Sequence, residues 1–515
     1  MGKRPTVAVA ARAIHLSKTR NCLLCRRPIP LRKLGAPAGR IVNRTFPMLR
    51  VMMTRAAVID NATEYYDSGE FLADLGRRVA FATESQDEAR ARDLRSYLTD
   101  ELAPALTDRL GCEARVVDNP AGDYPLLVAA RHEDDALPTV LVYGHGDVVL
   151  GEPERWRPGL DPWQVVVEGD RWYGRGTADN KGQHTINFAA LEHVLRVRGR
   201  LGFNLKVLVE TGEESGSPGL RTVCAQLRDE LAADVLIASD GPRVAAERPT
   251  LFLGSRGSTP FTLRADLREG SYHSGNWGGL LRNPATVLAG ALATIVDARG
   301  RILVPGLRPR EIPENVREAL RDIAVGGGPD DPAVDDGWGE PGLTPAERLV
   351  GWNSVEVLSL AAGNPDHPVN AIPGSAHAHC QLRSVVGTDV DKLGVILRKH
   401  LDEHGFPMVD VEVGPTMPPT RTDPDDPWVR WALGSISRTT GTAPALLPNL
   451  GGSLPNDAFA GELGLCTLWV PHSYPACAQH APDEHLLAPV AREGLRIMAG
   501  LFWDLGEDSP VRSHP

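Results

Sequence analysis

The spacing of apolar residues changes along the chain, and each spacing predicts a type of element. Near-continuous apolar runs of strand length, typical of strands buried on both faces, occupy 138–147, 203–211 and 234–242. Between them, segments 184–199 and 218–231 carry apolar residues at helical spacing, and Pro218 suits a first-turn position. Strands that alternate with helices in this way predict a largely parallel sheet covered by helices.

From about residue 255 the pattern changes to half-exposed, alternating strands. The predicted elements are a strand at 258–269, a helix at 284–297, strands at 353–361 and 377–385, a helix at 388–405 and a strand at 408–414. Asn283-Pro284 marks the start of the first helix, and Thr388 and Gly405 are the expected N-cap and stop of the second. The order βαββαβ is that of a ferredoxin-like sheet, with 298–352 as an insertion rich in Gly, Pro and Asp.

A chain of 515 residues exceeds what one hydrophobic core usually serves, so more than one domain is expected. We predict an α/β domain, 56–254 and 418–515, whose mostly parallel central sheet is flanked by helices, including surface helices at 64–81 and 88–106. A smaller ferredoxin-like α+β domain at 255–417 interrupts it. Residues 1–55 form a separate basic extension.

Composition and charge exclude several classes of protein. Hydrophobic residues make up 42% of the chain and charged residues 23%, and no apolar run approaches the roughly 18 residues of a membrane span. The formal charge is -11, but residues 1–55 hold 13 Lys and Arg and no acid. The remainder has 42 Lys and Arg against 66 Asp and Glu, a formal -24. Such an acidic body disfavours nucleic acid as a partner, and we expect no membrane partner.

The basic segment 1–55 has several interpretations. A transit-like leader or a nucleic-acid arm would have this charge, but the segment lacks aromatic interleaving and a clear amphipathic period. An unstructured extension, or a true start near Met48, Met52 or Met53, is the simpler explanation. Its CxxC at 22–25 has no second pair, which disfavours zinc binding there. The seven cysteines are odd in number and scattered, which favours a reducing, cytoplasmic setting.

Five segments place residues suited to metal binding at the starts of loops. They are His145 and Asp147 in GHGD, Asp179 in GRGTADNKG, Glu213 and Glu214 in ETGEESGS, Asp240 in ASDGP, and His480 in CAQHAPDEH. In parallel sheets, ligands gather beyond the carboxyl ends of the strands. Each residue alone has an ordinary explanation: a helix cap for Asp179, a helix-dipole partner for the glutamates, a turn for Asp240 and a surface loop for His480.

The combination of these residues favours a metal site. Two imidazoles and several carboxylates suit a borderline divalent cation such as Zn²⁺ or Mn²⁺, and a bridging carboxylate lets two ions share one site. Carboxylates packed together without a cation would repel one another and raise each other's pKa. The adjacent Glu213 and Glu214 fit two different tasks, since one can ligate while its neighbour stays free as a base.

Seven motifs in sequence order, GHGD, GRGTADNKG, ETGEESGS, SDG, HSGNWGG, NAIP and HAPDEH, resemble the M20 family of dinuclear metallopeptidases, which includes carnosine-dipeptidase-like enzymes. The similarity covers about residues 60–500. It implies a metal-binding catalytic domain interrupted by a lid, which in many members also mediates dimerisation. We therefore expect a homodimer through the lid and two divalent cations, Zn²⁺ first, with Mn²⁺ or Co²⁺ as alternatives.

Carried over by position, the resemblance also implies a set of metal ligands. Asp179 would bridge the two ions. His145 and Asp240 would complete the protein ligands of one ion. Glu214 and His480 would complete those of the other.

Two further acids have roles in the resemblance. Asp147 would orient His145. Glu213 would be the general base: it takes a proton from a water that two cations activate, and returns it to the departing amine. Because the peptide bond after the bridging aspartate is often cis in this family, we expect a cis bond between Asp179 and Asn180.

The lid contributes further candidates. His273 in HSGNWGG matches the family's lid histidine, which stabilises the oxyanion, commonly across the dimer, although a turn residue is the plain alternative. Asn370 in VNAIP and Arg383 in QLRSVVG match substrate-binding positions, and the planar fork of Arg383 suits a carboxylate. Ser453 in LGGSLPNDA would contact the substrate carboxylate, with a tight glycine turn as the alternative.

The chain departs from the family pattern at two places. Gly146 stands where the dipeptidases often have tyrosine, which leaves space for substrate, solvent or a lid side chain, and the segment around His480 lacks the usual flanking glycines. Neither change removes a ligand. The predicted function is hydrolysis of dipeptides or small peptide-like amides. A deacylase of N-acyl or N-carbamoyl amino acids is the nearest alternative, and an inactive metal-binding scaffold a remote one.

Overall fold

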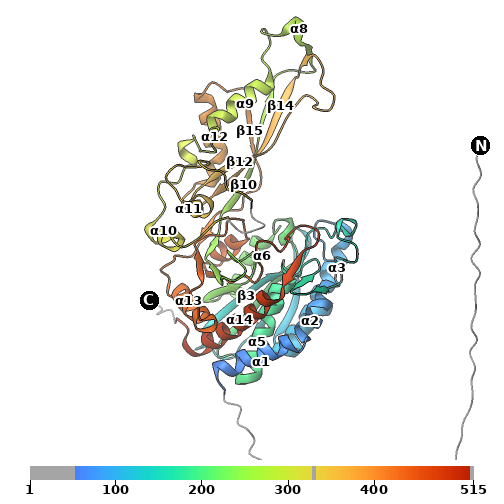
Figure 1. Ribbon diagram of the computed structural model, residues 1–515, viewed down its shortest axis with the longest axis vertical. Coiled ribbons are helices and arrows are strands. Elements are labelled where there is room, and N and C mark those ends of the chain that lie inside the picture. The colour runs from blue at the N-terminus through green and yellow to red at the C-terminus, as the bar shows by residue number, and fades with distance from the viewer. Residues whose placement is uncertain (1–52, 327–331, 511–515) are drawn as a thin grey trace, which may run out of the picture. The chain divides into compact units, whose positions relative to one another are not determined.

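The computed structural model describes residues 53–326 and 332–510, and the predictions made for 1–52 lie outside these residues. A large α/β domain is followed along the chain by a smaller α+β domain, after which the chain returns to the first (Figure 1). Within the described ranges, no helix has the length and apolar character that a membrane span requires.

The large domain is built on an eight-stranded sheet with the order β1-β2-β6-β3-β7-β18-β8-β17. Its strands are β1 Glu113–Asn119, β2 Gly122–Arg131, β3 Thr139–His145, β6 Asn204–Glu210, β7 Val235–Ala238, β8 Thr250–Phe252, β17 Ala445–Leu447 and β18 Cys466–Trp469. The central strands β6, β3, β7 and β18 are parallel to one another, whereas β2 runs antiparallel to both of its neighbours, β1 and β6. The predicted α/β fold with a mostly parallel central sheet is confirmed.

The near-continuous apolar runs are explained by burial of both faces of this sheet. Val140 and Val142 of β3 belong to one hydrophobic core, and Leu141 and Tyr143 belong to another. Successive side chains of a strand point to opposite faces, so a strand covered on both sides needs apolar residues at every position.

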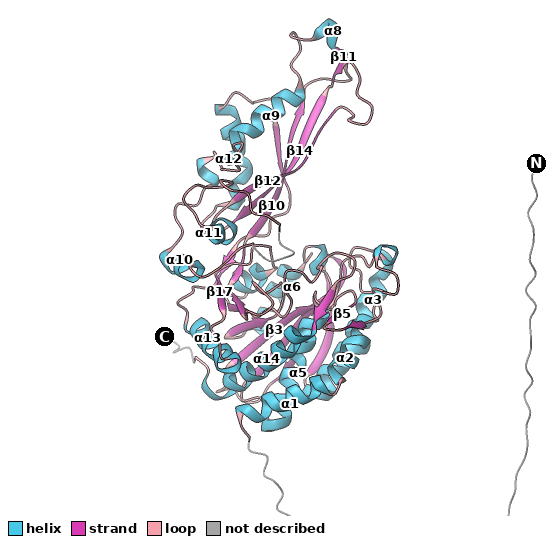
Figure 2. Cartoon of the chain, viewed as in Figure 1, coloured by secondary structure: helices cyan, strands magenta, loops and turns pink. Residues whose placement is uncertain are grey.

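Helices cover the two faces of the main sheet (Figure 2). The first core is closed by α1 Arg55–Asp67, α2 Glu70–Val79, α4 Ala103–Leu110, α5 Lys181–Arg198, α13 Pro427–Thr440 and α14 Ala488–Asp508. The second core is closed by α6 Leu220–Gln226, α7 Arg228–Leu231, α10 Glu314–Leu320 and α11 Pro345–Val350.

Several predicted helices differ in detail. The segment 64–81 contains two helices, because Gly69 adopts a left-handed backbone with φ 88° and separates α1 from α2. Pro218 does not lie in a first turn, since Gly219 is the N-cap of α6 and the helix breaks again at Leu227. The segment 88–106 begins with a 3-10 turn and then forms α3 Ala91–Ser96 and a π-helical stretch, Tyr97–Leu102.

The smaller domain has a four-stranded antiparallel sheet in the order β12-β14-β10-β15. Its strands are β10 Gly257–Asp266, β12 Ser354–Ala362, β14 Ser375–Ser384 and β15 Asp410–Val413, and its main helices are α9 Pro284–Ile295 and α12 Leu393–Glu403. Chain order and sheet order together are those of the predicted ferredoxin-like domain. Asn283 caps α9 as expected. Thr388 does not cap α12, because a 3-10 turn, Val390–Lys392, comes first and α12 begins at Leu393 with Lys392 as its N-cap.

The insertion 298–352 contributes to the core of the large domain. Val316 and Leu320 of α10 and Val350 of α11 pack in the same hydrophobic cluster as Phe252 and Leu447. The insertion therefore covers one face of the main sheet.

Short elements complete the fold. One small sheet contains β4 Val166–Glu168, β5 Arg171–Tyr173 and β19 His485–Leu487. Two further strand pairs are β9 Gly254–Ser255 with β16 Thr420–Arg421, and β11 Tyr272–His273 with β13 Ala371–Ile372. The short helix α8 Ser274–Trp277 directly follows β11. The pair β9 and β16 lies where the chain leaves and re-enters the large domain.

Candidate metal centre

The candidate ligands gather at the carboxyl edge of the parallel sheet. His145 is the last residue of β3, Glu213 and Glu214 follow β6, and Asp240 follows β7. Because β6, β3 and β7 are neighbouring parallel strands, their carboxyl ends meet at one edge. Residues almost a hundred positions apart are thereby brought together.

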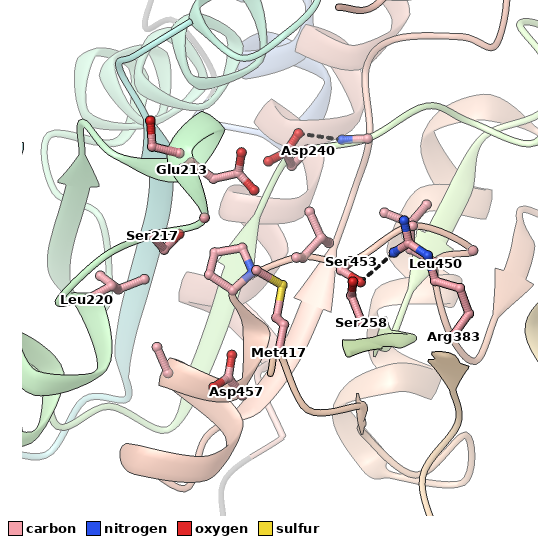
Figure 3. Close-up of a pocket in the computed structure, with 18 of the residues that line it drawn as sticks. Glu213, Ser217, Leu220, Asp240, Ser258, Arg383, Met417, Leu450, Ser453 and Asp457 are labelled. Atoms are coloured by element: carbon pink, nitrogen blue, oxygen red, sulfur yellow. Dashed lines mark hydrogen bonds between the residues drawn. The ribbon is translucent and has the colours of Figure 1, made fainter. Parts of the chain in front are cut away.

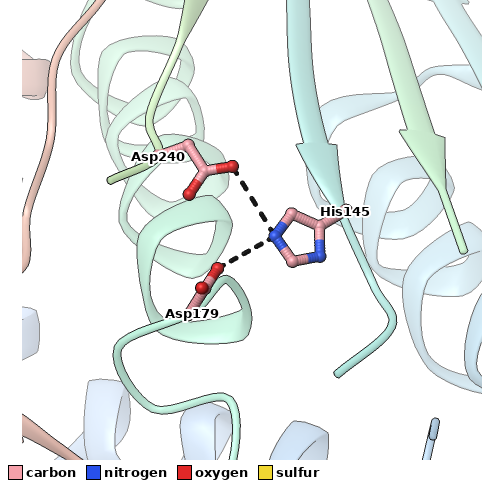
Figure 4. A group of neighbouring side chains, drawn as sticks. All are labelled: His145, Asp179 and Asp240. Carbon is pink, nitrogen blue, oxygen red and sulfur yellow. Dashed lines mark hydrogen bonds and ion pairs between the residues drawn. The ribbon is translucent and has the colours of Figure 1, made fainter. Parts of the chain in front are cut away.

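One cage consists of His145, Asp179 and Asp240, which are all buried (Figure 4). The Nε2 atom of His145 lies 3.0 Å from Oδ1 of Asp179 and 3.6 Å from Oδ2 of Asp240. One ligand atom from each residue falls within 4.8 Å of the other two. This is a compact donor set of one imidazole and two carboxylates.

A second cage shares Asp179 with the first. His480 Nε2 lies 3.1 Å from Asp179 Oδ2 and 2.9 Å from Glu214 Oε2. These three residues also offer ligand atoms within 4.8 Å of one another. The two oxygens of Asp179 therefore face different histidines, which is the arrangement that a bridging carboxylate requires.

The carboxylate of Asp147 connects His145 to the loop that carries the two glutamates. It accepts hydrogen bonds from the backbone N–H groups of Glu213 and Glu214, at 3.2 and 3.0 Å. One of its oxygens lies 3.3 Å from Nδ1 of His145, and that ring nitrogen also lies 3.1 Å from the backbone carbonyl of Asp147. The contacts leave Nε2 directed at the cage.

The loop that carries Asp179 is held by a residue that sequence reasoning missed. Glu484 is buried, pairs with the buried Arg175 at 2.8 Å, and accepts hydrogen bonds from the backbone N–H groups of Gly176, Ala178 and Asp179. Its position in the motif HAPDEH was the only signal in the sequence. The expected cis peptide bond between Asp179 and its successor is present.

The simpler explanations fail for Asp179 and the two glutamates, and the one for Asp240 is incomplete. Helix α5 has Asn180 as its N-cap, so Asp179 does not cap it. Glu213 and Glu214 form their own 3-10 turn, well before α6 begins. Asp240 does accept a hydrogen bond from the N–H of Gly241, as a turn residue would, but it also faces His145.

The electrostatics of the two cages fit divalent cations. Burial and the neighbouring Asp179 raise the pKa of Asp240 to about 6 and that of Glu214 to about 7. Hydrogen bonds to Asp179 and Glu214 raise the pKa of His480 to about 11. Mutual repulsion of buried carboxylates is relieved by positive charge, so the acids and imidazoles present fit a pair of cations as ligands.

Glu213 points into a pocket beside the cages. Burial, and then the charges of Asp240, Glu214 and Asp179, raise the pKa of Glu213 well above its usual value. A carboxyl with a raised pKa accepts a proton more readily than an ordinary glutamate does, as a general base must.

The pocket has a volume of about 900 Å³ and is lined by both domains (Figure 3). Arg383 of β14 and Ser453 of the Gly-rich loop line it together, and the guanidinium donates a hydrogen bond of 2.8 Å to the serine hydroxyl. Gln479, a residue not singled out from the sequence, also lines it and donates a hydrogen bond to Asp179. The structure thus brings two of the predicted substrate-binding residues together.

His273 and Asn370 do not line this pocket. Both are exposed and lie beside each other, because β11 pairs with β13 and the N–H of Ser274 donates to the carbonyl of Asn370. Within the chain, the side chain of His273 accepts a hydrogen bond from the N–H of Gly275 as the N-cap of α8.

The space beside Gly146, expected to receive substrate, solvent or a lid side chain, is occupied by a side chain of the large domain. The ring of Tyr97, from the π-helical stretch of the large domain, packs against it.

Fold and paired cages together define the class of protein, which is a metal-dependent hydrolase. The chain matches peptidase family M20/M25/M40 over residues 141–504 and belongs to that family. The predicted family and the predicted metallopeptidase class are confirmed, and members of the family depend on divalent metals.

Relatives with known names agree with this membership. The chain is 27% identical over 347 residues to a cysteinylglycine-S-conjugate dipeptidase of Corynebacterium striatum, which covers 65% of this chain and 73% of the relative. It is 33% identical over 192 residues to a Beta-Ala-His dipeptidase of Mus musculus, but this match spans only 37% of the chain and 39% of the relative. Among solved structures, an M20 family metallo-carboxypeptidase from Sulfolobus solfataricus superimposes with a TM-score of 0.73 at 25% identity, covering 85% of this chain and 99% of that one.

Proposed function

We propose that this protein hydrolyses the amide bond of dipeptides or similarly small peptides with the help of two divalent cations. The observation that carries the proposal is the pair of cages joined by Asp179, with Glu213 and the Arg383–Ser453 pair facing the same pocket. The names of the two dipeptidase relatives support a short substrate.

Each ligand has an assigned task in this proposal. His145 and Asp240 would hold one ion, Glu214 and His480 would hold the other, and Asp179, which belongs to both groups, would be shared between them. When bound, such a pair of cations lowers the pKa of a water and polarises the scissile carbonyl. Imidazole and carboxylate donors suit Zn²⁺, with Mn²⁺ or Co²⁺ as alternatives.

Glu213 moves the proton in the proposed reaction. Its carboxylate takes a proton from the attacking water and then donates it to the nitrogen of the leaving amine. Asp147 assists indirectly, because it fixes both the backbone of Glu213 and the ring of His145.

Arg383 and Ser453 bind the free carboxylate of the peptide. A guanidinium presents its N–H groups in a planar fork that matches a carboxylate, and the serine hydroxyl adds a further polar contact. Arg383 is partly buried, and among the described residues it makes no ion pair with an acid, although the charge of Glu356 acts on it from nearby. A substrate anion could therefore pair with it directly.

A homodimer through the lid is part of the proposal. β12 is an edge strand of the lid sheet and exposes Val357, Leu358 and Leu360 to solvent. Exposed apolar edges readily pair with a second copy. In such a dimer His273 would stabilise the oxyanion, and Asn370 would bind substrate, in the partner's site. The scattered cysteines support a cytoplasmic location.

The test uses full-length protein stripped of metal and then reloaded with Zn²⁺ or Mn²⁺. We expect reloading to restore hydrolysis of unblocked dipeptides and to leave N-acetyl amino acids uncleaved. Glu213→Gln should keep two metals per chain, measured by elemental analysis, and lose about 10³-fold in kcat. Glu230→Gln, which changes an exposed acid on the surface, is the matched control. Hydrolysis of N-acetyl amino acids alone would replace the dipeptidase with a deacylase.

A further inference from the structure

One buried acid that lines the substrate pocket has no role in the proposed reaction. Asp457 lines the same pocket as Glu213 and Arg383, and only 6% of it is exposed. It precedes the π-helical stretch Ala458–Glu462, but its side chain makes no capping hydrogen bond there. Burial has the largest effect on this carboxyl and raises its pKa, although the nearby backbone N–H groups of Asp457 and Ala458 act to lower it.

The counter-ion of Asp457 is Arg221, which is shared with a second acid. Nη1 of Arg221 lies 3.1 Å from Oδ2 of Asp457, but 54% of the arginine side chain is exposed. The same guanidinium donates to Glu462 on the surface, at 3.2 Å. Because Arg221 has this second acid and is open to solvent, another cation can take its place beside Asp457 at modest cost.

The approach to Asp457 is apolar. Leu220 and Met417 line the same pocket as Asp457, Glu213 and Asp240 (Figure 3). Leu454 of the Gly-rich loop also lines the pocket. A methylene chain can pack on such a wall, while its charged end reaches a carboxylate beyond it.

We propose that Asp457 is a specificity residue that binds the cationic side chain of a lysine- or arginine-containing peptide, with Leu220 and Met417 contacting the aliphatic stem. The inference rests on the proposed peptidase function. It divides the pocket by charge: Arg383 and Ser453 receive the peptide carboxylate, and Asp457 receives a positive side chain.

The energetics favour a cation over a neutral group at this place. Burial raises the pKa of Asp457, and Arg221 counteracts this. A buried carboxylate gains most from a partner that is charged and able to donate hydrogen bonds. An uncharged side chain of the same length would pack on the apolar wall but would leave Asp457 with Arg221 as its counter-ion.

The test compares Lys-Ala and Ala-Lys with the same dipeptides in which norleucine replaces lysine, using metal-loaded full-length protein. Norleucine has a stem of similar length and no charge. We expect kcat/KM to favour lysine over norleucine about tenfold at one of the two positions. Asp457→Asn should abolish this ratio, while the surface control Glu230→Gln should keep it.

A second variant covers the case in which Asp457→Asn fails to fold. Arg221→Ala removes the exposed competitor and should increase the ratio for lysine severalfold. The inference would be overturned if the wild type cleaved the lysine and norleucine peptides at equal rates. It would also be overturned if Asp457→Asn or Arg221→Ala left the ratio of the two rates unchanged. In either case, hydrolysis of Ala-Ala would still uphold the peptidase function. Absence of hydrolysis for every dipeptide, Ala-Ala included, would overturn both.

Discussion

The aromatic ring of Tyr97 packs directly against Gly146. A Cβ atom built on the glycine would lie 2.7 Å from Cε1 and 2.8 Å from Cδ1 of the tyrosine. The ring is fully buried, and its hydroxyl hydrogen-bonds to Nε2 of His184 at 2.7 Å. Tyr97 therefore supports the turn between His145 and Asp147 from behind, and this support needs a glycine.

Gly146→Ala should accordingly destabilise the protein by about 1–3 kcal/mol, because the added methyl overlaps a ring that has no room to move. Urea unfolding measures this, and metal titration should show weaker binding since the turn carries His145. The matched control is Gly76→Ala in α2, where an added Cβ meets no atom within 4 Å and should be neutral or stabilising. Equal stability of the two variants would contradict the close packing.

Asp147→Asn should weaken metal binding about 10–100-fold without unfolding the protein. The substitution removes the negative charge beside His145 and one acceptor for the glutamate loop. Competition with a metal chelator measures the affinity. Asp118→Asn, at an exposed acid paired with Arg95, should leave it unchanged. If both variants bind metal as the wild type does, Asp147 has no orienting role.

Arg256 connects the lid to the large domain through a buried guanidinium that is only 4% exposed. It donates to the carbonyls of Leu349 and Arg383 and to the hydroxyl of Ser354, and among the described residues it makes no ion pair with an acid. Burial, and then the nearby Arg383, lower the pKa of Arg256 to about 10.

Arg256→Met should destabilise the protein by roughly 2–3 kcal/mol, because buried acceptors lose their donor. It should also raise KM for peptides with a free carboxylate more than it lowers kcat, since the Arg383 strand loses an anchor. Steady-state kinetics separate the two parameters. Arg115→Met removes an exposed guanidinium paired with Glu230 and is the control. An unchanged KM would refute the link to Arg383.

Asp74 should make stability depend on acid pH. Burial alone would raise its pKa, but hydrogen bonds from Arg109, Tyr65 and Arg77 hold the pKa of Asp74 well below its usual value. A carboxyl with a depressed folded-state pKa contributes stability that is fully present above about pH 4, the pKa of the unfolded chain, and is lost as pH falls toward the folded pKa.

Asp74→Asn should therefore cost about 3 kcal/mol at pH 7 and flatten the dependence of stability on pH below about pH 5. Urea midpoints measured between pH 3 and 7 check both effects. Asp67→Asn, which removes an exposed acid paired with Arg492, should cost less than about 1 kcal/mol. Parallel pH curves for wild type and Asp74→Asn would show that the buried cluster does not titrate.

The gathering of the candidate metal ligands at one edge of the sheet could be predicted from the sequence. His145 and Asp240 end or follow apolar runs that read as parallel strands, and parallel strands place their carboxyl ends at one edge. The ferredoxin-like lid was also predictable, because its alternating strands and two helices keep their order despite the insertion 298–352.

The sequence alone determined which residues stand at the ends of the strands, since hydrophobic period and turn chemistry are local properties. Only the tertiary structure decided which side chains surround those residues. Tyr97, which packs behind Gly146, lies outside the motifs. Glu484 and Asp457 lie inside motifs, but no local period shows that one contacts the Asp179 loop and the other lines the pocket. Their contacts depend on how helices and loops from distant parts of the chain pack over the sheet, and packing is a property of the whole fold.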